Sequence, residues 1–352
     1  MIRDLTVGSP MKLIWQFSIP LVLGNLFQQM YNMVDTVIVG RYLGLNALTS
    51  VSSTTSITFL IIGFCLGTCT GLSVPVAQRF GAKSYSEMRK FVMNAAYLAV
   101  FLAVIMTVVT CVLCGSILTW MKTPDQFYQG AYDYLFVIFL GIPFTLMYNY
   151  LSSVLRSLGD SRTPFMFLAF SAILNIFLDL FCILVLKWGC AGAAIATITA
   201  QAVSGILCLV YIFKKVQIMH LEAQDRKVEG AAVKELLLMG IPTGLQFSIT
   251  AIGSMVMQSA NNKLGSVYVS GFTAGMRIKQ FTMCPFDAFA TAASVFCSQN
   301  LGAGQAKRIK QGLWQAIAVA VGYGVVAGLV MIVFGRPLSM IFVKKSAVDV
   351  LD

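Results

Sequence analysis

Residues 91–121 read FVMNAAYLAVFLAVIMTVVTCVLCGSILTWM and contain no Asp, Glu, Lys or Arg. The block is longer than the ~20 residues that an α-helix needs to cross the hydrocarbon core of a bilayer. An uninterrupted apolar run of this length is typical of a transmembrane helix and not of a helix in a water-soluble core. This stretch therefore predicts a membrane protein.

Charge-free blocks recur along the chain, at residues 42–78, 188–213 and 236–262. Only 11% of all residues are charged and 58% are apolar, whereas ordinary soluble domains carry roughly 25% charged residues. We therefore expect an all-α polytopic membrane protein. The pattern predicts nine spans, at 13–38, 49–76, 92–114, 133–156, 164–186, 190–213, 235–260, 267–298 and 312–334.

The formal net charge of +11 comes from basic residues between the apolar blocks, so it does not indicate a nucleic-acid-binding face. Basic residues gather in alternate connecting segments, such as 79–90 and 214–234, as the positive-inside rule describes. We expect a multi-pass protein of the cell (inner or plasma) membrane with a cytoplasmic N-terminus. The predicted outer loops before the last span hold Arg41, Lys122, Lys187 and Lys263.

The sequence offers little support for an enzyme. The nine cysteines lie in or beside apolar blocks without a paired spacing, which favours their use as small apolar side chains. Cys111 and Cys114 form a CxxC, but inside a predicted span and without the βαβ context of redox proteins. The only histidine, His220, is in a charged loop, which argues against His-based zinc sites and Ser-His triads. No HExxH, GxSxG or P-loop occurs. A membrane enzyme is the weaker alternative, and we expect no cofactor.

Two halves of the chain resemble each other. Ile19-Pro20 aligns with Ile241-Pro242, and Leu43-Gly44 aligns with Leu264-Gly265. Gln78, Gly81 and Ala82 align with Gln299, Gly302 and Ala303. A repeat of six helices keeps both halves in the same orientation, which is a known plan of transporters that bind substrate between parallel repeats.

The longest polar break separates the halves. We expect a first six-helix bundle at 1–213, a cytoplasmic linker at 214–234 and a partial second bundle at 235–352. After the ninth span, GRPLSMIFVKKS aligns with the loop that follows the third, so the second bundle contains only three predicted helices. We therefore expect a fragment or a truncated gene product.

One face of the first span is polar from midspan to its outer end. At about 100° per residue its polar residues fall within an arc of about 120°. They are Asn25, Gln28, Gln29, Asn32 and Asp35.

Spans five and six carry similar faces, formed by Ser171, Asn175, Asp179, Thr197, Gln201 and Ser204. We expect the polar faces of the three spans to meet inside the first bundle. A charged carboxylate in the hydrocarbon region is costly, so Asp35 and Asp179 are candidates to bind a proton or Na⁺. The alternative is structural: the polar side chains hold the helices together, and Asp35 stays hydrated near the outer interface.

Two further features of the first half concern its helices. Pro20 removes a backbone hydrogen bond within the first span and is a candidate hinge, although prolines also occur in membrane helices for packing alone. Gly63, Gly67 and Gly71 form a GxxxGxxxG ridge that indicates close helix packing.

The second half lacks a carboxylate at the position of Asp35, where the alignment places Met257. Its seventh span carries only neutral polar residues, among them Gln246 and Thr250, which are substrate-path candidates. Arg277, together with Lys279 and Asp287, must face protein or a water-filled path, and whether these residues bind substrate or pair with neighbours is open.

The motifs NMVDTVIVGRYLG, AQRFGA, LRSLGDSRTP, NIFLD and SQNLGAG together resemble the MATE (multidrug and toxic compound extrusion) family, in its bacterial DinF-like branch. The resemblance covers essentially the whole chain. It implies twelve helices in two six-helix bundles, a central cavity open alternately to either side, and export of organic cations coupled to H⁺ or Na⁺.

Carried over from the family, the ion-coupling carboxylates fall on Asp35 and Asp179, and their polar partners on Asn175 and Thr197. The bending proline falls on Pro20, and a tyrosine at the start of span four on Tyr134. The acidic residue that some branches carry in span seven is absent, with Thr250 in that region, which puts a second-bundle sodium site in doubt.

We therefore expect an ion-coupled secondary antiporter that exports organic cations or other xenobiotics by alternating access. Its partners are small molecules and membrane lipid, without nucleic acid, and we expect a monomer. The alternative is a flippase of lipid-linked precursors from the same superfamily, which requires a strongly cationic cavity for a pyrophosphate group.

Overall fold

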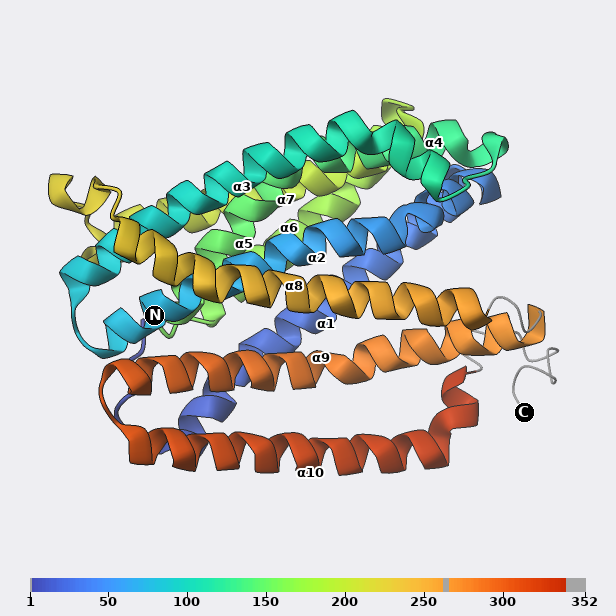
Figure 1. Ribbon diagram of the computed structural model, residues 1–352. Coiled ribbons are helices and arrows are strands. Elements are labelled where there is room, and N and C mark those ends of the chain that lie inside the picture. The colour runs from blue at the N-terminus through green and yellow to red at the C-terminus, as the bar shows by residue number, and fades with distance from the viewer. Residues whose placement is uncertain (1, 262–265, 340–352) are drawn as a thin grey trace.

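The computed structural model describes residues 2–261 and 266–339, where the chain forms helices joined by short turns (Figure 1). The predicted loop residue Lys263 and the last part of the predicted second bundle, 340–352, lie outside the described residues. The α-helices are α1 (Pro10–Tyr42), α2 (Leu45–Gly81), α3 (Tyr85–Trp120), α4 (Asp125–Leu140), α5 (Ile142–Ser157), α6 (Arg162–Leu180), α7 (Gly189–Lys215), α8 (Gly230–Asn261), α9 (Ser266–Gly302) and α10 (Ala306–Ser339). The shorter elements are a π-helical turn η1 (Phe181–Val185) and two 3₁₀ turns, η2 (Gln217–Met219) and η3 (Ala223–Arg226).

Six of the described helices are long and apolar enough to cross a membrane, and the bent pair of α4 and α5 makes a seventh. The long helices α1, of 33 residues, and α9, of 37, fall outside this group. They are the helices in which Asp35, Arg277 and Asp287 interrupt apolar sequence. The chain is thus an all-α, multi-pass membrane protein, and the count of nine spans stays a prediction.

Span four differs from the prediction of one helix over 133–156. The structure has two helices, α4 and α5, bent by 47° at Gly141. Pro143 has no N–H to continue the hydrogen-bond ladder across the bend. Gly141 also lies against α7, since a Cβ there would be 2.2 Å from Ile198 Cγ1. The bend therefore has both a local cause and a tertiary one.

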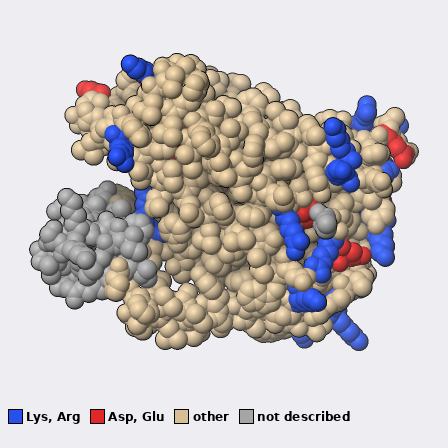
Figure 2. Space-filling model, turned by 180° about the vertical axis from the view of Figure 1, so that it is seen from behind, with Lys and Arg blue, Asp and Glu red and all other residues tan. Residues whose placement is uncertain are grey.

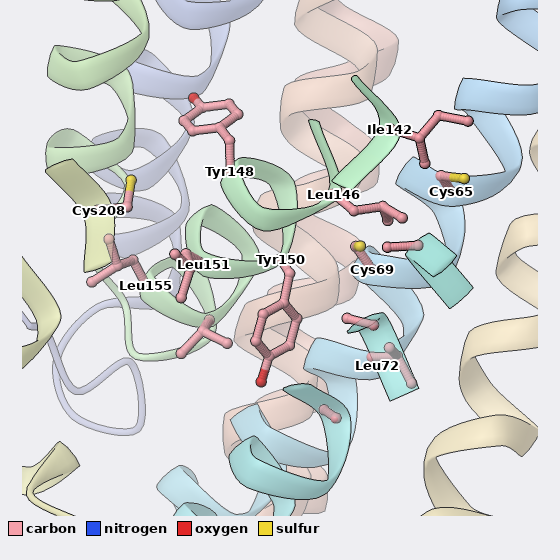
Figure 3. Close-up of a cluster of buried hydrophobic side chains, with 14 of the residues drawn as sticks. Cys65, Cys69, Leu72, Ile142, Leu146, Tyr148, Tyr150, Leu151, Leu155 and Cys208 are labelled. Carbon is pink, nitrogen blue, oxygen red and sulfur yellow. The ribbon is translucent and has the colours of Figure 1, made fainter. Parts of the chain in front are cut away.

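Helices α1 to α7 form what we call the first lobe, and α8 to α10 the second lobe. The core of the first lobe includes Cys65 and Cys69 of α2, Tyr150 of α5 and Cys208 of α7, all buried (Figure 3). The Tyr150 hydroxyl donates to the Val92 carbonyl of α3 at 2.5 Å. All nine cysteines are free thiols, in agreement with their predicted use as small apolar side chains.

The glycine ridge of α2 packs closely against α8 of the second lobe. A Cβ at Gly67 would lie 2.6 Å from the Thr243 carbonyl of α8, and one at Gly71 would lie 2.4 Å from the Met239 carbonyl. Only glycine, which has no Cβ, allows the backbones of α2 and α8 to approach this closely. The packing role predicted for the ridge is confirmed.

The repeat-related residues meet each other at one end of the molecule. A Cβ at Gly81 would lie 1.8 Å from the Gln299 carbonyl, and a Cβ at Gly302 would lie 1.7 Å from the Gln78 carbonyl. Such reciprocal contacts are what a two-fold relation between the halves produces. We call this end, where α2 and α9 finish, the closed end.

The segment that precedes α1 fills the closed end between the lobes. Leu5 is 1% exposed, and its backbone N–H donates to Gln299 Oε1 at 2.9 Å. Gln299 Nε2 in turn donates to the Ser157 carbonyl of α5 at 2.8 Å. Nearby, Arg79 and Glu235 form a bidentate ion pair between α2 and α8 with both distances at 2.7 Å. The closed end is therefore sealed by backbone, amide and charged contacts together.

Toward the opposite end the lobes separate. Between α1 and α9, Asn25 Nδ2 donates to the Cys284 carbonyl at 3.2 Å. Helices α2 and α8 cross where Gly67 lies against Thr243 and diverge toward the right-hand end of the view (Figure 1). We call this the open end, and Asp35 lies toward it on α1.

Candidate functional site

The two carboxyl groups singled out from the sequence lie in contact inside the first lobe. Asp35 is near the end of α1, and Asp179, fully buried, is near the end of α6. The packing of α1 against α6 brings the carboxyl groups within hydrogen-bonding reach of each other. A hydrogen bond between two carboxyl groups requires a proton on one of them, because an ionised carboxylate only accepts.

Asn175 holds Asp179 from the preceding turn of α6. The Asn175 amide is oriented so that both its nitrogen and its oxygen have hydrogen-bond partners. In this orientation, Asn175 Nδ2 donates to Asp179 Oδ2 at 3.2 Å. Its Oδ1 then accepts the backbone N–H of Thr197 on α7 at 3.3 Å. Asn175 therefore joins α6 to α7 at the carboxyl pair, as the predicted meeting of the polar faces requires.

Two tyrosines complete the cluster. Tyr134 of α4 lies near both carboxyl groups, and so does Tyr31 of α1, whose hydroxyl shares a hydrogen bond with the Thr197 side chain. The sequence prediction included Tyr134 but missed Tyr31. Its position four residues before Asp35 places both residues on one face of α1, and this spacing was the signal that could have identified it.

Three buried oxygens of this region have no hydrogen-bond partner among the described residues: Asp35 Oδ1, Asp179 Oδ1 and Gln201 Oε1. They come from α1, α6 and α7, and Gln201 is one helical turn beyond Thr197. Buried acceptors without partners are uncommon in proteins. Oxygen atoms of this kind can accept a proton or bind a hard cation such as Na⁺.

The rest of the predicted polar face of α1 is only partly involved. Gln28 and Gln29 are half-buried and Asn32 is exposed. Asn25 was expected to face the interior of the first bundle, but it binds the Cys284 carbonyl of α9. Its contact lies between the lobes because at this level α1 lies between α6, which Gly24 faces, and α9, which Asn25 faces. Pro20 is buried within α1, which continues as one helix from Pro10 to Tyr42.

The predicted residues of the second lobe lie apart from the carboxyl pair. Gln246 and Thr250 are exposed on α8, where the Thr250 hydroxyl donates to the Gln246 carbonyl at 2.9 Å. Arg277 and Asp287 are exposed on α9. The part of these four residues in a substrate path stays a prediction.

Comparison with known proteins covers most of the chain. The family model of MatE matches residues 20–181 and 242–351. The chain is 31% identical over 342 residues to the probable multidrug resistance protein YpnP of Bacillus subtilis, covering 97% of this chain and 76% of that protein. It is 24% identical over 339 residues to an FAD transporter of Shewanella oneidensis, covering 94% and 74%.

A solved structure described as the outward-facing conformation of a multidrug resistance MATE family transporter of the MOP superfamily has the same fold. Its TM-score is 0.92 at 24% identity, with 99% of this chain and 77% of that one covered. The similarity extends over both lobes.

Proposed function

Because the chain belongs to the MatE family, we propose that it is a multidrug exporter that moves organic cations or other xenobiotics by alternating access, driven by H⁺ or Na⁺. The observation that carries the proposal is the pair of Asp35, which is half-buried, and Asp179, which is buried. The pair joins two helices and has oxygens without a hydrogen-bond partner among the described residues. A relative described as a probable multidrug resistance protein supports the substrate class.

The orientation follows from the charges. Lys and Arg gather at the right-hand end in Figure 2, which is the closed end. By the positive-inside rule this end faces the cytoplasm. The lobes then diverge toward the outside, so the arrangement corresponds to the outward-facing state of an exporter. The contacts of Gln299 with Leu5 and Ser157 are the ones that must break before the cytoplasmic side opens.

Coupling depends on the charge of the carboxyl pair. While the pair is negatively charged, it attracts an organic cation into the space between the lobes. A proton or Na⁺ that enters from outside neutralises the one negative charge that the hydrogen-bonded pair of Asp35 and Asp179 retains. The polar faces of α1, α6 and α7 then close around Asn175 and Thr197, and α1 bends at Pro20. The substrate loses its site and leaves, and the bound ion is later released inside.

The test is efflux of a fluorescent cation such as ethidium from vesicles that contain the full-length protein, under proton and sodium gradients imposed separately. Asp179→Asn and Asp35→Asn should each abolish gradient-driven efflux, because a neutral amide cannot exchange a proton. Asp125→Asn is the matched control, since Asp125 is an exposed carboxylate at the start of α4. It should leave efflux unchanged.

The outcome also locates the coupling site. If both site variants pump at the normal rate while Thr250→Ala stops transport, coupling resides in the second lobe and the proposed mechanism is wrong. If the rate of wild-type efflux is the same with and without each gradient, transport is not coupled to either ion.

An anionic substrate is the second candidate function. Arg277 and Lys279 are exposed on α9 where the lobes diverge, and one relative is described as an FAD transporter. An anionic pyrophosphate compound, including the lipid-linked precursors of a flippase, would contact these cations. In the same vesicles, inhibition of ethidium efflux by FAD that is lost in Arg277→Gln would favour this function over cation export.

A further inference from the structure

The linker between the lobes folds onto α3 as an ordered structure. Asp225 is fully buried and accepts from Arg89 Nε of α3 at 2.6 Å and from the Glu222 N–H at 2.9 Å. Arg89 also binds Glu222 at 3.2 Å. Glu222 and Asp225, the two carboxylates nearest Arg226 in the linker, are thus both paired with Arg89.

The linker also reaches along α3 toward the membrane interior. Asn94, fully buried, donates to the Lys227 carbonyl at 3.2 Å and accepts the Glu229 N–H at 3.1 Å. Farther along α3, the Tyr97 hydroxyl donates to the Arg226 carbonyl at 3.1 Å. Lys90 is the last charged residue of α3. At about 1.5 Å per helical residue, Tyr97 lies roughly 10 Å farther along the helix than Lys90. Arg226 therefore lies at the depth of lipid headgroups, where tyrosines are also common.

Beside this anchored segment the surface is hollowed. A groove of about 590 Å³ is lined by Met93 of α3, Phe213 of α7, and the linker residues His220, Leu221 and Arg226. Phe213 is 53% exposed. From the groove, exposed apolar side chains continue along both helices toward the membrane centre. These are Val100, Phe101 and Val104 on α3, and Ile206 and Val210 on α7.

The groove thus combines a basic rim with an apolar floor that continues into the lipid-facing surface. Arg226 and His220 are exposed, and Arg226 has no ion pair within the part of the chain that the structure describes. A free phosphate would use only the rim, whereas a phospholipid matches the rim with its headgroup and the floor with its acyl chains.

We propose that this groove binds an anionic phospholipid, with the phosphate against Arg226 and His220 and the first part of an acyl chain against Met93 and Phe213. The site lies on the outer surface of the first lobe, apart from the space between the lobes. Bound lipid would join the linker to α3 and α7, so it stabilises the segment that connects the two lobes. The carboxyl pair and its ion are not involved.

The test is native mass spectrometry of the full chain in detergent with equal amounts of phosphatidylglycerol and phosphatidylcholine. We expect the wild type to retain phosphatidylglycerol preferentially. One basic residue near a headgroup contributes ~1 kcal/mol, so Arg226→Gln should lower phosphatidylglycerol affinity about fivefold and leave phosphatidylcholine unchanged. His220→Gln should lower it as well. Lys307→Gln is the control, because it removes one exposed positive charge at the same end of the molecule but on α10. It should change retention less than twofold.

Folding does not confound this comparison, since Tyr97 binds the backbone carbonyl of Arg226, and the Arg226 side chain has no hydrogen bond within the described residues. Equal thermal unfolding of wild type and Arg226→Gln checks this. Three results would overturn the proposal: equal retention of both lipids, an equal loss in Lys307→Gln, or displacement of phosphatidylglycerol by inorganic phosphate at the same concentration. Because the readout is lipid retention, failure here leaves the proposed transport function untouched.

Discussion

A methyl group at Gly81 should force the closed end apart. An ideal Cβ there would lie 1.8 Å from the Gln299 carbonyl, whereas ordinary contact begins at 3.4 Å, a shortfall of about 1.6 Å. The obstacle is a backbone oxygen within α9, which cannot rotate away as a side chain can. Gly81→Ala therefore requires α2 and α9 to separate, and with them the two lobes.

The size of the effect follows from overpacking, which costs ~1–3 kcal/mol in well-packed proteins. Because the cost applies only when the end is closed, it shifts the equilibrium between closed and open arrangements by about 5- to 150-fold. Alanine also forms helix better than glycine by ~1 kcal/mol. This gain in helix stability is equal in the closed and open arrangements, so it does not change the equilibrium between them.

Hydrogen exchange measured by mass spectrometry can report the opening without new cysteines. In the closed arrangement the Leu5 N–H is buried and bonded to Gln299 Oε1, so peptides that cover residues 2–8 should exchange slowly. In Gly81→Ala they should exchange about 5- to 150-fold faster. Gly322→Ala is the control, because Gly322 is helical in α10 and a Cβ there meets nothing within 4 Å.

Unchanged exchange at residues 2–8 in Gly81→Ala would refute the argument that this contact seals the closed end. A similar acceleration in Gly322→Ala would show that the effect is a general loss of stability. Gly302→Ala should behave like Gly81→Ala, because its Cβ would lie 1.7 Å from the Gln78 carbonyl.

Two more predictions concern the carboxyl cluster and the linker. Tyr31→Phe removes the hydrogen bond to Thr197, worth ~0.5–1.5 kcal/mol, and should slow ethidium efflux about two- to tenfold, whereas Tyr42→Phe at an exposed position should have no effect. Burial acts to raise the pKa of Asp225, but the Glu222 N–H and the Arg89 guanidinium outweigh it, so the pKa lies below the ordinary value. Docking of the linker is therefore fully stabilised above the unfolded pKa of about 3.9 and is lost as pH falls through the lower folded pKa. Hydrogen exchange of residues 220–229, divided by the intrinsic exchange rate at each pH, should rise over that acidic range in the wild type. A flat profile of this ratio, or one unchanged in Asp225→Asn, would contradict this.

Much of the site could be predicted because its residues repeat at helical spacing. The spacing of Asn175 and Asp179 placed them on one face of a helix, and the structure shows them in contact. Tyr31 was missed because a tyrosine in a membrane helix is common and carries no charge to mark it. The spacing placed Asn25 on the polar face of α1, but it could not show that α9 packs against that face at the level of Asn25.

What the sequence by itself determined is local: long charge-free blocks require helices in a membrane, and helical periodicity groups the polar residues into faces. The internal repeat also indicated which residues correspond between the halves. Only the tertiary structure decided where the faces meet. Gly81 and Gln299 are far apart in the chain, and their contact depends on how the two lobes pack as whole bodies. The bend at Gly141 and the contact of Asp35 with Asp179 depend in the same way on neighbouring helices, and no local sequence pattern encodes those distances.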